Sequence, residues 1–489
     1  MNIAIIGGGI GGLMSALYLS QDGYQVTIYE KEEKLGGRLK YVEKNGFKID
    51  EGPTIVLLPE MLQQLLDEAG IDRSRYELLL CDPLYSIHYQ DGSTYTKYKD
   101  IDRQIAELKR QFPDDMNGFL RFMDEGRERL SIGQSAFLQK SFSDSKSFWT
   151  NKNIKALMKL KPYQSIQKLM KSYFQDEKLQ IAYSLQTLYV GGNPFHTPAM
   201  YALISFSEHE HGVYYLKGGY AKLVQLLEEE LKSKNVTIKH GQNVTNMKTI
   251  DNKITSLEVN GKWLEYDAFI FNGDYPTLQK IFKEVPKRSF VPSSSCVLLY
   301  FGLDSIYKDV NVHQFILGNS FSTHMNEVFE SKVVPSDPSI YTFHPSIMDD
   351  TLAPKGKGVL YTLIPVPANV SIDWSQQHNW IERIIYRLEK QAFPQLRKRI
   401  EWMQVRTPND AEHFGLFQGG NFGIAPTLFQ SGVFRPQVKP TKFENLYAVG
   451  ASVHPGGGIP IVMQGAKLLH EQMTKDNTNN EVKNHAYLK

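Results

Sequence analysis

Glycines near the start of the chain have a spacing that suits phosphate binding. Gly7, Gly9 and Gly12 form a Gly-x-Gly-x-x-Gly pattern between two apolar runs, Ile3–Ile6 and Leu13–Leu19. In a strand–turn–helix unit the first glycine permits a tight turn, the second lets backbone approach a pyrophosphate, and the third lets the helix pack on the strand. The start of such a helix also attracts phosphate through its free N–H groups. The expected dinucleotide-binding residues here are Gly7, Gly8, Gly9, Ile10, Gly11 and Gly12.

An acidic residue and a second pair of glycines follow this unit. The apolar run Gln25–Tyr29 leads to Glu30, at the distance expected of a carboxylate that hydrogen-bonds a ribose hydroxyl. A glutamate at the surface end of a strand is the alternative. Gly36 and Gly37 then precede Arg38. A nicotinamide dinucleotide needs no second glycine pair, whereas a longer dinucleotide needs the chain to pass close along its second half.

A third glycine-rich stretch lies near the end of the chain. Residues 450–467 read GASVHPGGGIPIVMQGAK, with three consecutive glycines between two prolines and an apolar run behind them. Bare glycine suits either the close approach of backbone to a ligand or a tight turn into a helix. His454 is the one titratable side chain in this turn. We expect a structural histidine that is hydrogen-bonded to backbone; a general base is the alternative.

Composition places these motifs in an ordinary globular chain with two or three domains. The chain has 489 residues, of which 41% are hydrophobic and 22% charged, and its formal net charge of +2 gives no indication of nucleic-acid binding. Cys81 and Cys296 lack the spacing of a metal site, so we expect buried, inert thiols, compatible with a reducing cytoplasm. We expect no signal peptide, because no basic stretch precedes the first apolar run, and the sequence contains no apolar run of about 18 residues. We therefore expect a soluble protein or one on a membrane surface.

A lysine-rich stretch in the middle of the chain predicts such a surface. From Ser147 to Phe174 there is no acidic residue, and apolar residues alternate with six lysines: Lys152, Lys155, Lys159, Lys161, Lys168 and Lys171. A basic amphipathic segment of this kind can lie in a membrane interface. We expect peripheral association with the cytoplasmic membrane; a solvated helical hairpin is the alternative.

The succession of Gly7–Gly12, Glu30-Lys31 and Leu35–Arg38 resembles the FAD-binding start of a large flavoprotein group. That group includes amine oxidases, protoporphyrinogen oxidases and carotenoid desaturases. The resemblance implies FAD as the cofactor. We expect no metal, because no cluster of metal ligands stands out in the sequence. Gly52-Pro53-Thr54 is similar to the turn that lies against the isoalloxazine in these proteins; a plain β-turn is the alternative.

Longer stretches resemble the carotenoid desaturases and, within them, the bacterial dehydrosqualene desaturases that act on thirty-carbon chains. The most similar are GPTIVLLP at 52–59, LQTLYVGGNPFHTPAMYALISF at 185–206, FGIAPTLFQSGVFRPQ at 422–437 and GASVHPGGGIP at 450–460. The resemblance runs from Asn2 to about Met473. It implies an α/β fold with a discontinuous, FAD-binding Rossmann-like domain of the glutathione-reductase type and an inserted mixed α+β substrate domain.

The order of strand-like runs predicts where these two domains lie in the chain. We expect residues 1–75, 215–285 and 440–489 to form the FAD-binding domain. Residues 76–214 and 286–439 are expected to form the substrate-binding and membrane-associating region.

The resemblance also implies which further residues bind FAD. The turn at 450–460 would close over the flavin, with the helix after Pro460 directed at the isoalloxazine. Ser452 occupies the place where related flavoproteins often carry an acidic residue. The implied set is Glu30, Lys31, Gly36, Gly37, Arg38, Gly52, Pro53, Thr54, Val244, Gly450, Ser452, Gly458, Ile459 and Pro460.

The chemistry that the resemblance implies is FAD-dependent desaturation of a thirty-carbon carotenoid precursor, with oxygen or a quinone as the electron acceptor. The protein would line an apolar tunnel and hold one bond of the polyene against the flavin. Oxidation of a terminal methyl group, carotenoid isomerisation, lipid escort without catalysis and amine oxidation are the alternatives. Of these, terminal oxidation uses the same FAD motifs, and only local similarity favours desaturation.

Overall fold

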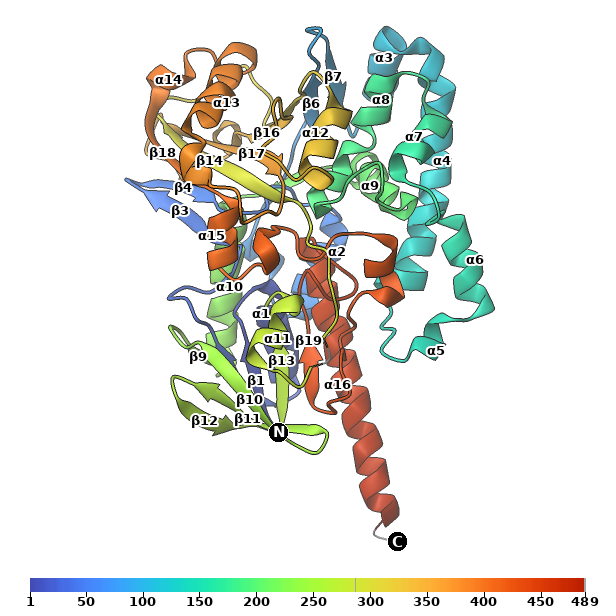
Figure 1. Cartoon of the computed structure of the whole chain (residues 1–489), viewed down its shortest axis with the longest axis vertical. Helices are drawn as coiled ribbons and strands as arrows, with labels where there is room; N and C mark the ends of the chain where they lie inside the picture. Colours follow the sequence, from blue (N-terminus) through green and yellow to red (C-terminus); the bar gives the residue numbers. More distant parts are fainter. Residues whose placement is uncertain (286, 488–489) are drawn as a thin grey trace.

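A parallel sheet of five short strands forms the lower half of the molecule (Figure 1). The computed structural model describes residues 1–285 and 287–487. The strand order is β19 (Leu446–Ala448), β13 (Ala268–Phe271), β1 (Asn2–Ile6), β2 (Gln25–Tyr29) and β9 (Thr237–Lys239), all parallel. These strands come from the beginning, the middle and the end of the chain. The expected discontinuous Rossmann-like fold is therefore confirmed.

Three helices cover one face of this sheet. They are α1 (Ile10–Gln21), α10 (Gly219–Ser233) and α16 (Ile459–Tyr487). Helix α1 lies between the sheet and the other two helices, so residues 11–19 are all buried and it has no polar face in its centre. The expected helix after Pro460 begins one residue earlier, at Ile459, so that Pro460 lies in the first turn, where proline is favoured.

The other face of the parallel sheet is covered by a three-stranded antiparallel sheet. This smaller sheet consists of β10 (Val244–Ile250), β11 (Lys253–Val259) and β12 (Lys262–Glu265). Met247 and Leu257 pack with Phe269 and Phe271 of the parallel sheet in one core cluster.

A second large sheet, in the upper half of Figure 1, has seven strands. Their order is β18 (Ile400–Arg406), β14 (Ser295–Leu303), β17 (Gly358–Val366), β16 (Ile340–Phe343), β15 (His313–Ile316), β6 (Tyr85–His88) and β7 (Thr94–Lys97). All nine residues of β14 are buried because successive side chains enter different cores: Val297 and Leu299 pack with α13 (His378–Gln391), and Leu298 and Tyr300 face the opposite way.

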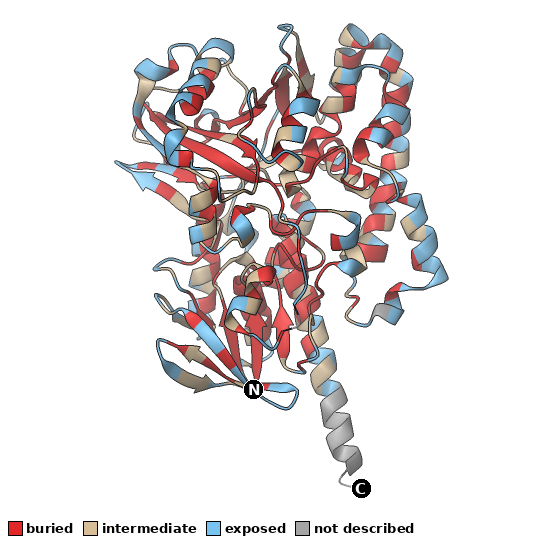
Figure 2. Ribbon diagram, in the orientation of Figure 1, coloured by how far each residue is buried: buried red, intermediate tan, exposed pale blue. Residues whose placement is uncertain are grey.

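Helices between β7 and β8 form the right-hand side of Figure 1. They are α3 (Ile101–Gln111), α4 (Met116–Gly133), α5 (Ser145–Phe148), α6 (Asn151–Lys159), α7 (Ile166–Tyr173), α8 (Glu177–Ala182) and α9 (Leu203–His211). Much of α6 is pale blue in Figure 2, whereas α4, α7 and α9 bury one side against the rest of the molecule.

Shorter elements join these parts. They are β3 (Tyr41–Lys44), β4 (Phe47–Asp50), α2 (Pro59–Glu68), β5 (Leu78–Leu80), β8 (Tyr214–Leu216), α11 (Leu278–Ile281), α12 (Phe321–Phe329), α14 (Leu396–Arg399) and α15 (Pro408–His413). The exact limits of the two expected domains stay predictions. Cys81 and Cys296 are free and buried, as expected. Within the described residues no helix is long and apolar enough to cross a membrane.

Candidate active site

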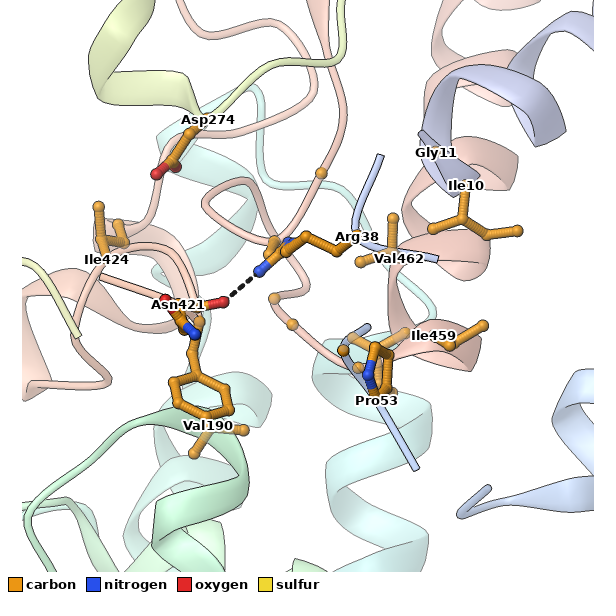
Figure 3. Close-up of a pocket in the computed structure, with 18 of the residues that line it drawn as sticks. Ile10, Gly11, Arg38, Pro53, Val190, Asp274, Asn421, Ile424, Ile459 and Val462 are labelled. Atoms are coloured by element: carbon orange, nitrogen blue, oxygen red, sulfur yellow. Dashed lines mark hydrogen bonds between the residues drawn. The ribbon is translucent and has the colours of Figure 1, made fainter. Parts of the chain in front are cut away.

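One cavity of about 830 Å³ lies between the two large sheets. At one end it is lined by the glycine-rich turns, and at the other by apolar side chains of the seven-stranded sheet and the helical region. Figure 3 shows part of its wall, where Ile10 and Gly11 of α1, Pro53, Arg38 and Ile459 of α16 lie around the same space. The three glycine motifs, which are spread over more than 400 positions of the sequence, are therefore brought to one site.

The first glycine motif lines this cavity with backbone. Gly7 has φ +101°, a conformation that favours glycine, and Gly9 is the N-cap of α1. Ile10 and Gly11 also line the cavity, so the unpaired N–H groups of the first helical turn are available to a phosphate. Gly12 does not line it: a Cβ there would lie 2.4 Å from the Gly7 carbonyl oxygen, which explains the close packing of α1 on β1.

Glu30 is buried at the end of β2, and its carboxylate is held by backbone. Its Oε2 accepts the N–H of Gly8 at 2.7 Å and its Oε1 accepts the N–H of Glu32 at 2.9 Å. Gly8 therefore orients the carboxylate without lining the cavity itself. Glu30 does line the cavity, and each carboxylate oxygen has a further lone pair for a ligand hydroxyl. Val244 lines the same end, as expected.

The second glycine pair places Arg38 beside the first motif. The N–H of Gly36 donates to the Gly8 carbonyl oxygen at 2.8 Å, and Gly36 and Gly37 both have positive φ. The Arg38 guanidinium donates to the carbonyl oxygen of Asn421, as the dashed line in Figure 3 shows. Burial lowers the pKa of Arg38, and the nearby carboxylate of Asp274 acts in the opposite direction.

Other expected residues of the early motifs also line the cavity. Lys31 donates from its Nζ to the carbonyl oxygen of Phe414 at 2.6 Å. In the Gly52-Pro53-Thr54 turn, a Cβ on Gly52 would lie 2.7 Å from the Arg38 carbonyl oxygen, so this turn packs directly on the second glycine motif. Lys31, Gly52, Pro53 and Thr54 all line the cavity.

The late glycine turn forms another part of the wall. Gly450 and Gly458 have positive φ, and both line the cavity together with Ile459 and Pro460. Ser452 does not line it. Its hydroxyl donates to the carboxylate of Asp274 and accepts the N–H of Ile424 at 3.1 Å. Ser452 therefore holds an acidic side chain in place rather than facing the cavity itself.

Asp274 is the functional candidate that sequence reasoning missed. It follows β13, lines the cavity, and accepts the N–H of Phe417 at 2.9 Å as well as the Ser452 hydroxyl. An acidic group thus reaches this part of the site from a segment about 180 positions away from the late motif. Its place directly after a strand of the parallel sheet was the available signal, because ligands bind at the carboxyl ends of such strands.

His454 is buried in the cavity wall. Its Nε2 lies 3.1 Å from the carbonyl oxygen of Phe137 and 3.0 Å from that of Lys140, so this nitrogen carries the proton and donates to backbone. Its Nδ1 has no partner among the described residues. Burial lowers the pKa of His454 to about 4. This geometry fits the structural role and makes the imidazole a poor proton acceptor near neutral pH.

The remaining wall is mainly apolar. From the seven-stranded sheet come Leu298, Phe315, Tyr341, Tyr361 and Leu363. From the helical region between β7 and β8 come Leu130, Phe137, Phe148, Leu157, Leu160, Leu188, Tyr189 and Leu203. An enclosed apolar surface with few polar groups suits a long hydrophobic ligand. Sequence reasoning named none of these as site residues, because they come from many elements and share no motif.

The residues present fit FAD. A backbone cradle of glycines, a buried carboxylate and a second glycine pair with an arginine follow one another along a single cavity, as an extended dinucleotide requires. Wherever these glycines pack on backbone, a side chain would collide: a Cβ on Gly36 would lie 2.6 Å from the Leu39 carbonyl oxygen. The assignment of individual residues to parts of the cofactor stays a prediction.

Comparison with known proteins agrees with this cofactor. The model of the flavin-containing amine oxidoreductase family matches residues 10–467. The 4,4'-diapolycopen-4-al dehydrogenase of Metabacillus indicus is 56% identical, over 98% of this chain and 98% of that protein. The 4,4'-diapophytoene desaturase of Staphylococcus haemolyticus is 32% identical, over 97% of this chain and 99% of that protein.

A solved structure shares the fold. The crystal structure of an oxidoreductase from Methanosarcina mazei matches with a TM-score of 0.67 at 17% identity, covering 96% of this chain and 100% of that one. Together with the family match and the two relatives, this shows that the chain is an FAD-dependent oxidoreductase that belongs to the flavin-containing amine oxidoreductase family and, within it, to the bacterial carotenoid desaturases.

Proposed function

We propose that this protein oxidises the terminal aldehyde of a thirty-carbon carotenoid to the carboxylic acid. The observation that carries the proposal is the difference between the two relatives: 56% identity to a protein named for an aldehyde substrate, against 32% to one named as a desaturase. Desaturation, which local motifs favoured, becomes the second candidate.

The cavity supports a reaction of this kind. A carotenoid aldehyde is an extended apolar chain with one polar end, and the cavity joins an apolar channel to a glycine-lined cradle. When bound, FAD supplies a two-electron oxidant that accepts a hydride. The overall change is aldehyde plus water to carboxylic acid, with two electrons and two protons removed. The aldehyde carbon gains one oxygen, which comes from water.

The chain's own residues have three tasks in this proposal. Arg38, Asp274 and the glycine turns hold the cofactor and exclude solvent from it. The aromatic side chains of Tyr189, Phe315 and Tyr361 hold the polyene in one orientation, which turns an encounter into a positioned reaction. His454 is left out as a base, because burial holds its pKa near 4.

A competition between substrates tests the proposal. FAD-loaded protein is mixed with liposomes that contain equal amounts of 4,4'-diapolycopen-4-al and dehydrosqualene, with oxygen as acceptor in one series and a quinone in the other. We expect the carboxylic acid as the main product, with a kcat/KM for the aldehyde at least about tenfold above that for dehydrosqualene. Conversion of dehydrosqualene to longer polyenes, with the aldehyde untouched, would establish the second candidate instead.

Substrates of this kind dissolve in lipid, and we further propose that the protein takes them from the cytoplasmic membrane surface through an apolar rim. This rim consists of Trp149, Met158, Phe429 and Phe434, whose exposed fractions are 54%, 55%, 70% and 38%. Phe434 makes edge contacts with Trp149 and Phe429, at ring-centroid distances of 6.3 and 5.7 Å. Phe434 also lines the cavity, so the rim leads directly into it.

Among the lysines of this region, two differ from the sequence expectation. Lys159 pairs with Glu128, and Lys161 lies 3.9 Å from Glu125, both on α4, so these charges are partly neutralised. Several apolar residues of the segment, among them Leu160 and Leu169, are buried in the protein. The surface that remains for an anionic membrane combines the rim with the exposed Lys152 and Lys155.

Vesicle sedimentation tests this surface. Replacing Trp149 and Phe429 by serine removes large exposed apolar groups and is expected to weaken binding to phosphatidylglycerol-containing vesicles by about tenfold. The matched control is Ile250→Ser, which removes an apolar group that is 67% exposed on the distant three-stranded sheet. Equal binding of the double variant, the control and the unchanged protein would contradict the proposal.

A further inference from the structure

Four side chains form a row of hydrogen bonds that begins in the cavity wall and continues behind it. Thr54 Oγ1 lies 2.7 Å from the Tyr341 hydroxyl oxygen, and that oxygen lies 2.7 Å from Nδ1 of His313. Nε2 of His313 lies 3.5 Å from Sγ of Cys81. Thr54 and Tyr341 line the cavity, whereas His313 and Cys81 lie behind them and are fully buried.

The row carries no charge. Burial lowers the pKa of His313 to about 3 and raises the pKa of the Cys81 thiol to about 12. The rings that stack on His313 belong to Tyr341 and Phe343, which supply no counter-charge. At neutral pH the row therefore consists of two hydroxyls, a neutral imidazole and a thiol.

Each of these four groups can both donate and accept, so the row has two directions. In one direction Thr54 donates to Tyr341, Tyr341 to His313 and His313 to Cys81, which leaves Thr54 as an acceptor for a ligand. In the other direction every bond is reversed and Thr54 becomes a donor. The two directions differ in which nitrogen of His313 carries the proton, and neither contains an ion, so each avoids the cost of a buried charge.

A hydrocarbon polyene has no group that could form a hydrogen bond with this row. Its carbon and hydrogen atoms form no comparable hydrogen bond, and a valine in place of Thr54 would fill the same volume. The Thr54 hydroxyl uses one hydrogen bond on Tyr341 and retains capacity for a second on the cavity side. Within an apolar wall, this spare capacity indicates a ligand atom that is an uncharged oxygen.

We propose that the Thr54 hydroxyl, supported by Tyr341, His313 and Cys81, is the subsite that binds the oxygen of the carotenoid's terminal group. This proposal rests on the proposed function. It adds the residue that distinguishes an oxygenated end of the substrate from a hydrocarbon end. With Thr54 as donor the row binds an aldehyde C=O; with the row reversed it binds the O–H of the aldehyde hydrate. The two directions thus match the two uncharged forms of the substrate that aldehyde oxidation requires.

Binding to the pre-reduced holoenzyme tests the subsite without turnover. FAD-loaded protein is reduced with dithionite under anaerobic conditions and titrated with 4,4'-diapolycopen-4-al or with the parent hydrocarbon, 4,4'-diapolycopene. A hydrogen bond to the carbonyl of a conjugated aldehyde shifts its absorption to longer wavelength. We expect Thr54→Val to abolish this shift and to weaken aldehyde binding by about tenfold, while binding of the hydrocarbon stays the same.

The matched control is Thr342→Val. Thr342 is a buried threonine next to Tyr341 on β16, but it is absent from the cavity lining and its hydroxyl has no partner among the described residues. This control is expected to bind both ligands as the unchanged protein does. Tyr341→Phe, which leaves Thr54 in place but interrupts the row, is expected to give a partial loss of both the shift and the affinity.

Four outcomes are decisive. Loss of the absorption shift in Thr54→Val, with retention of FAD, supports the subsite. An unchanged shift and affinity for the aldehyde in Thr54→Val overturns it, as does a variant that changes only flavin absorbance or FAD affinity, since Thr54 would then contact the cofactor. The unchanged protein could also bind the aldehyde with the absorption shift and yet form no carboxylic acid once its flavin is reoxidised. In that case the subsite stands and the proposed reaction fails.

Discussion

The cavity has two parts that are built in different ways: the cradle, lined by the glycine turns, and the channel, lined by apolar side chains. The cradle is made mainly of backbone: it consists of glycines, the free N–H groups at the start of α1, and the Glu30 carboxylate, which the backbone N–H groups of Gly8 and Glu32 hold in place. The channel is made of side chains from the seven-stranded sheet and the helices around it. A cradle tolerates almost no added atom, whereas a channel tolerates exchange among apolar side chains of similar volume.

A buried ion pair next to the channel is an exception to this tolerance. Behind Tyr189 lies a fully buried ion pair, Lys97 and Glu208, with Nζ and Oε2 2.8 Å apart. Glu208 also accepts hydrogen bonds from the hydroxyls of Tyr85 at 2.6 Å and Tyr189 at 2.9 Å. Burial lowers the pKa of Lys97, and the carboxylate opposes that shift. The pair fixes Tyr189, which lines the cavity, from behind.

The largest expected effect comes from breaking this pair. Glu208→Gln leaves the Lys97 charge without a counter-charge in a place that water does not reach, so we expect the free energy of unfolding to fall by about 3–5 kcal/mol. Urea denaturation followed by circular dichroism measures it. Glu77→Gln is the control, since Glu77 pairs with Lys217 at the surface, where we expect a change below about 1 kcal/mol. Similar losses in both variants would contradict the account of the channel.

The next effect concerns the cradle. Gly12→Ala places a Cβ 2.4 Å from the Gly7 carbonyl oxygen, which is a backbone atom and cannot move aside as a flexible side chain could. We expect a loss of about 2–3 kcal/mol in stability and a large fall in bound FAD, measured by flavin absorbance per protein. Leu298→Met, in the channel, is the counterpart, and we expect it to retain FAD and to cost less than about 1.5 kcal/mol. Full FAD content in Gly12→Ala would remove the distinction between the two regions.

A third effect concerns Asp50, at the end of β4 and just before the Gly52-Pro53-Thr54 turn. The Asp50 carboxylate accepts the N–H groups of Tyr220 and Ala221 at the start of α10, and burial raises its pKa to about 7. Because the folded state then binds a proton that the unfolded chain has released, stability falls as pH rises from the unfolded pKa toward the folded one. Between about pH 4.5 and pH 6 this amounts to about 2 kcal/mol.

Asp50→Asn removes this titration while keeping an oxygen acceptor. We expect the unfolding free energy of the variant, relative to that of the unchanged protein, to rise by that amount over the same pH interval. Thermal unfolding at a series of pH values measures it. A constant difference between the two proteins across the interval would show that Asp50 is ionised throughout in the folded state.

The difference between cradle and channel also determined how much of the site could be predicted from the sequence. Gly7–Gly12, Glu30, Gly36–Arg38 and the late glycine turn were found because each is a short local pattern whose backbone geometry restricts the residue type. Of the expected FAD-binding residues, all except Gly8, Gly12 and Ser452 line the cavity. Asp274 was missed because its role depends on Ser452, about 180 positions later in the chain.

The channel could not be predicted residue by residue. Tyr341 on β16 meets Thr54 near the start of the chain, a contact between positions 287 apart. The pairing of the strands creates this contact, and no local pattern encodes it. Buried, largely apolar residues run through almost the whole of β14 and β17, so their sequence does not distinguish the side chains that face the cavity from those that face α13.

The smallest expected effect concerns His454. With a pKa of about 4 it stays neutral across the working range, so His454→Gln, which can still donate to backbone, is expected to cost about 1 kcal/mol in stability. The pH profile of kcat between about pH 6 and pH 8 is expected to keep its shape. A profile that loses an ascending limb in the variant would restore the general-base interpretation.

Anaerobic mixing tests the central claim, that one cavity brings the end of a carotenoid aldehyde to the flavin. The FAD-loaded protein is mixed with 4,4'-diapolycopen-4-al in liposomes without any other acceptor, and flavin and polyene absorbance are recorded together. We predict loss of the oxidised flavin spectrum with one carboxylic acid formed per flavin. An oxidised flavin and an unchanged aldehyde, in protein that retains FAD and binds the liposomes, would contradict the claim.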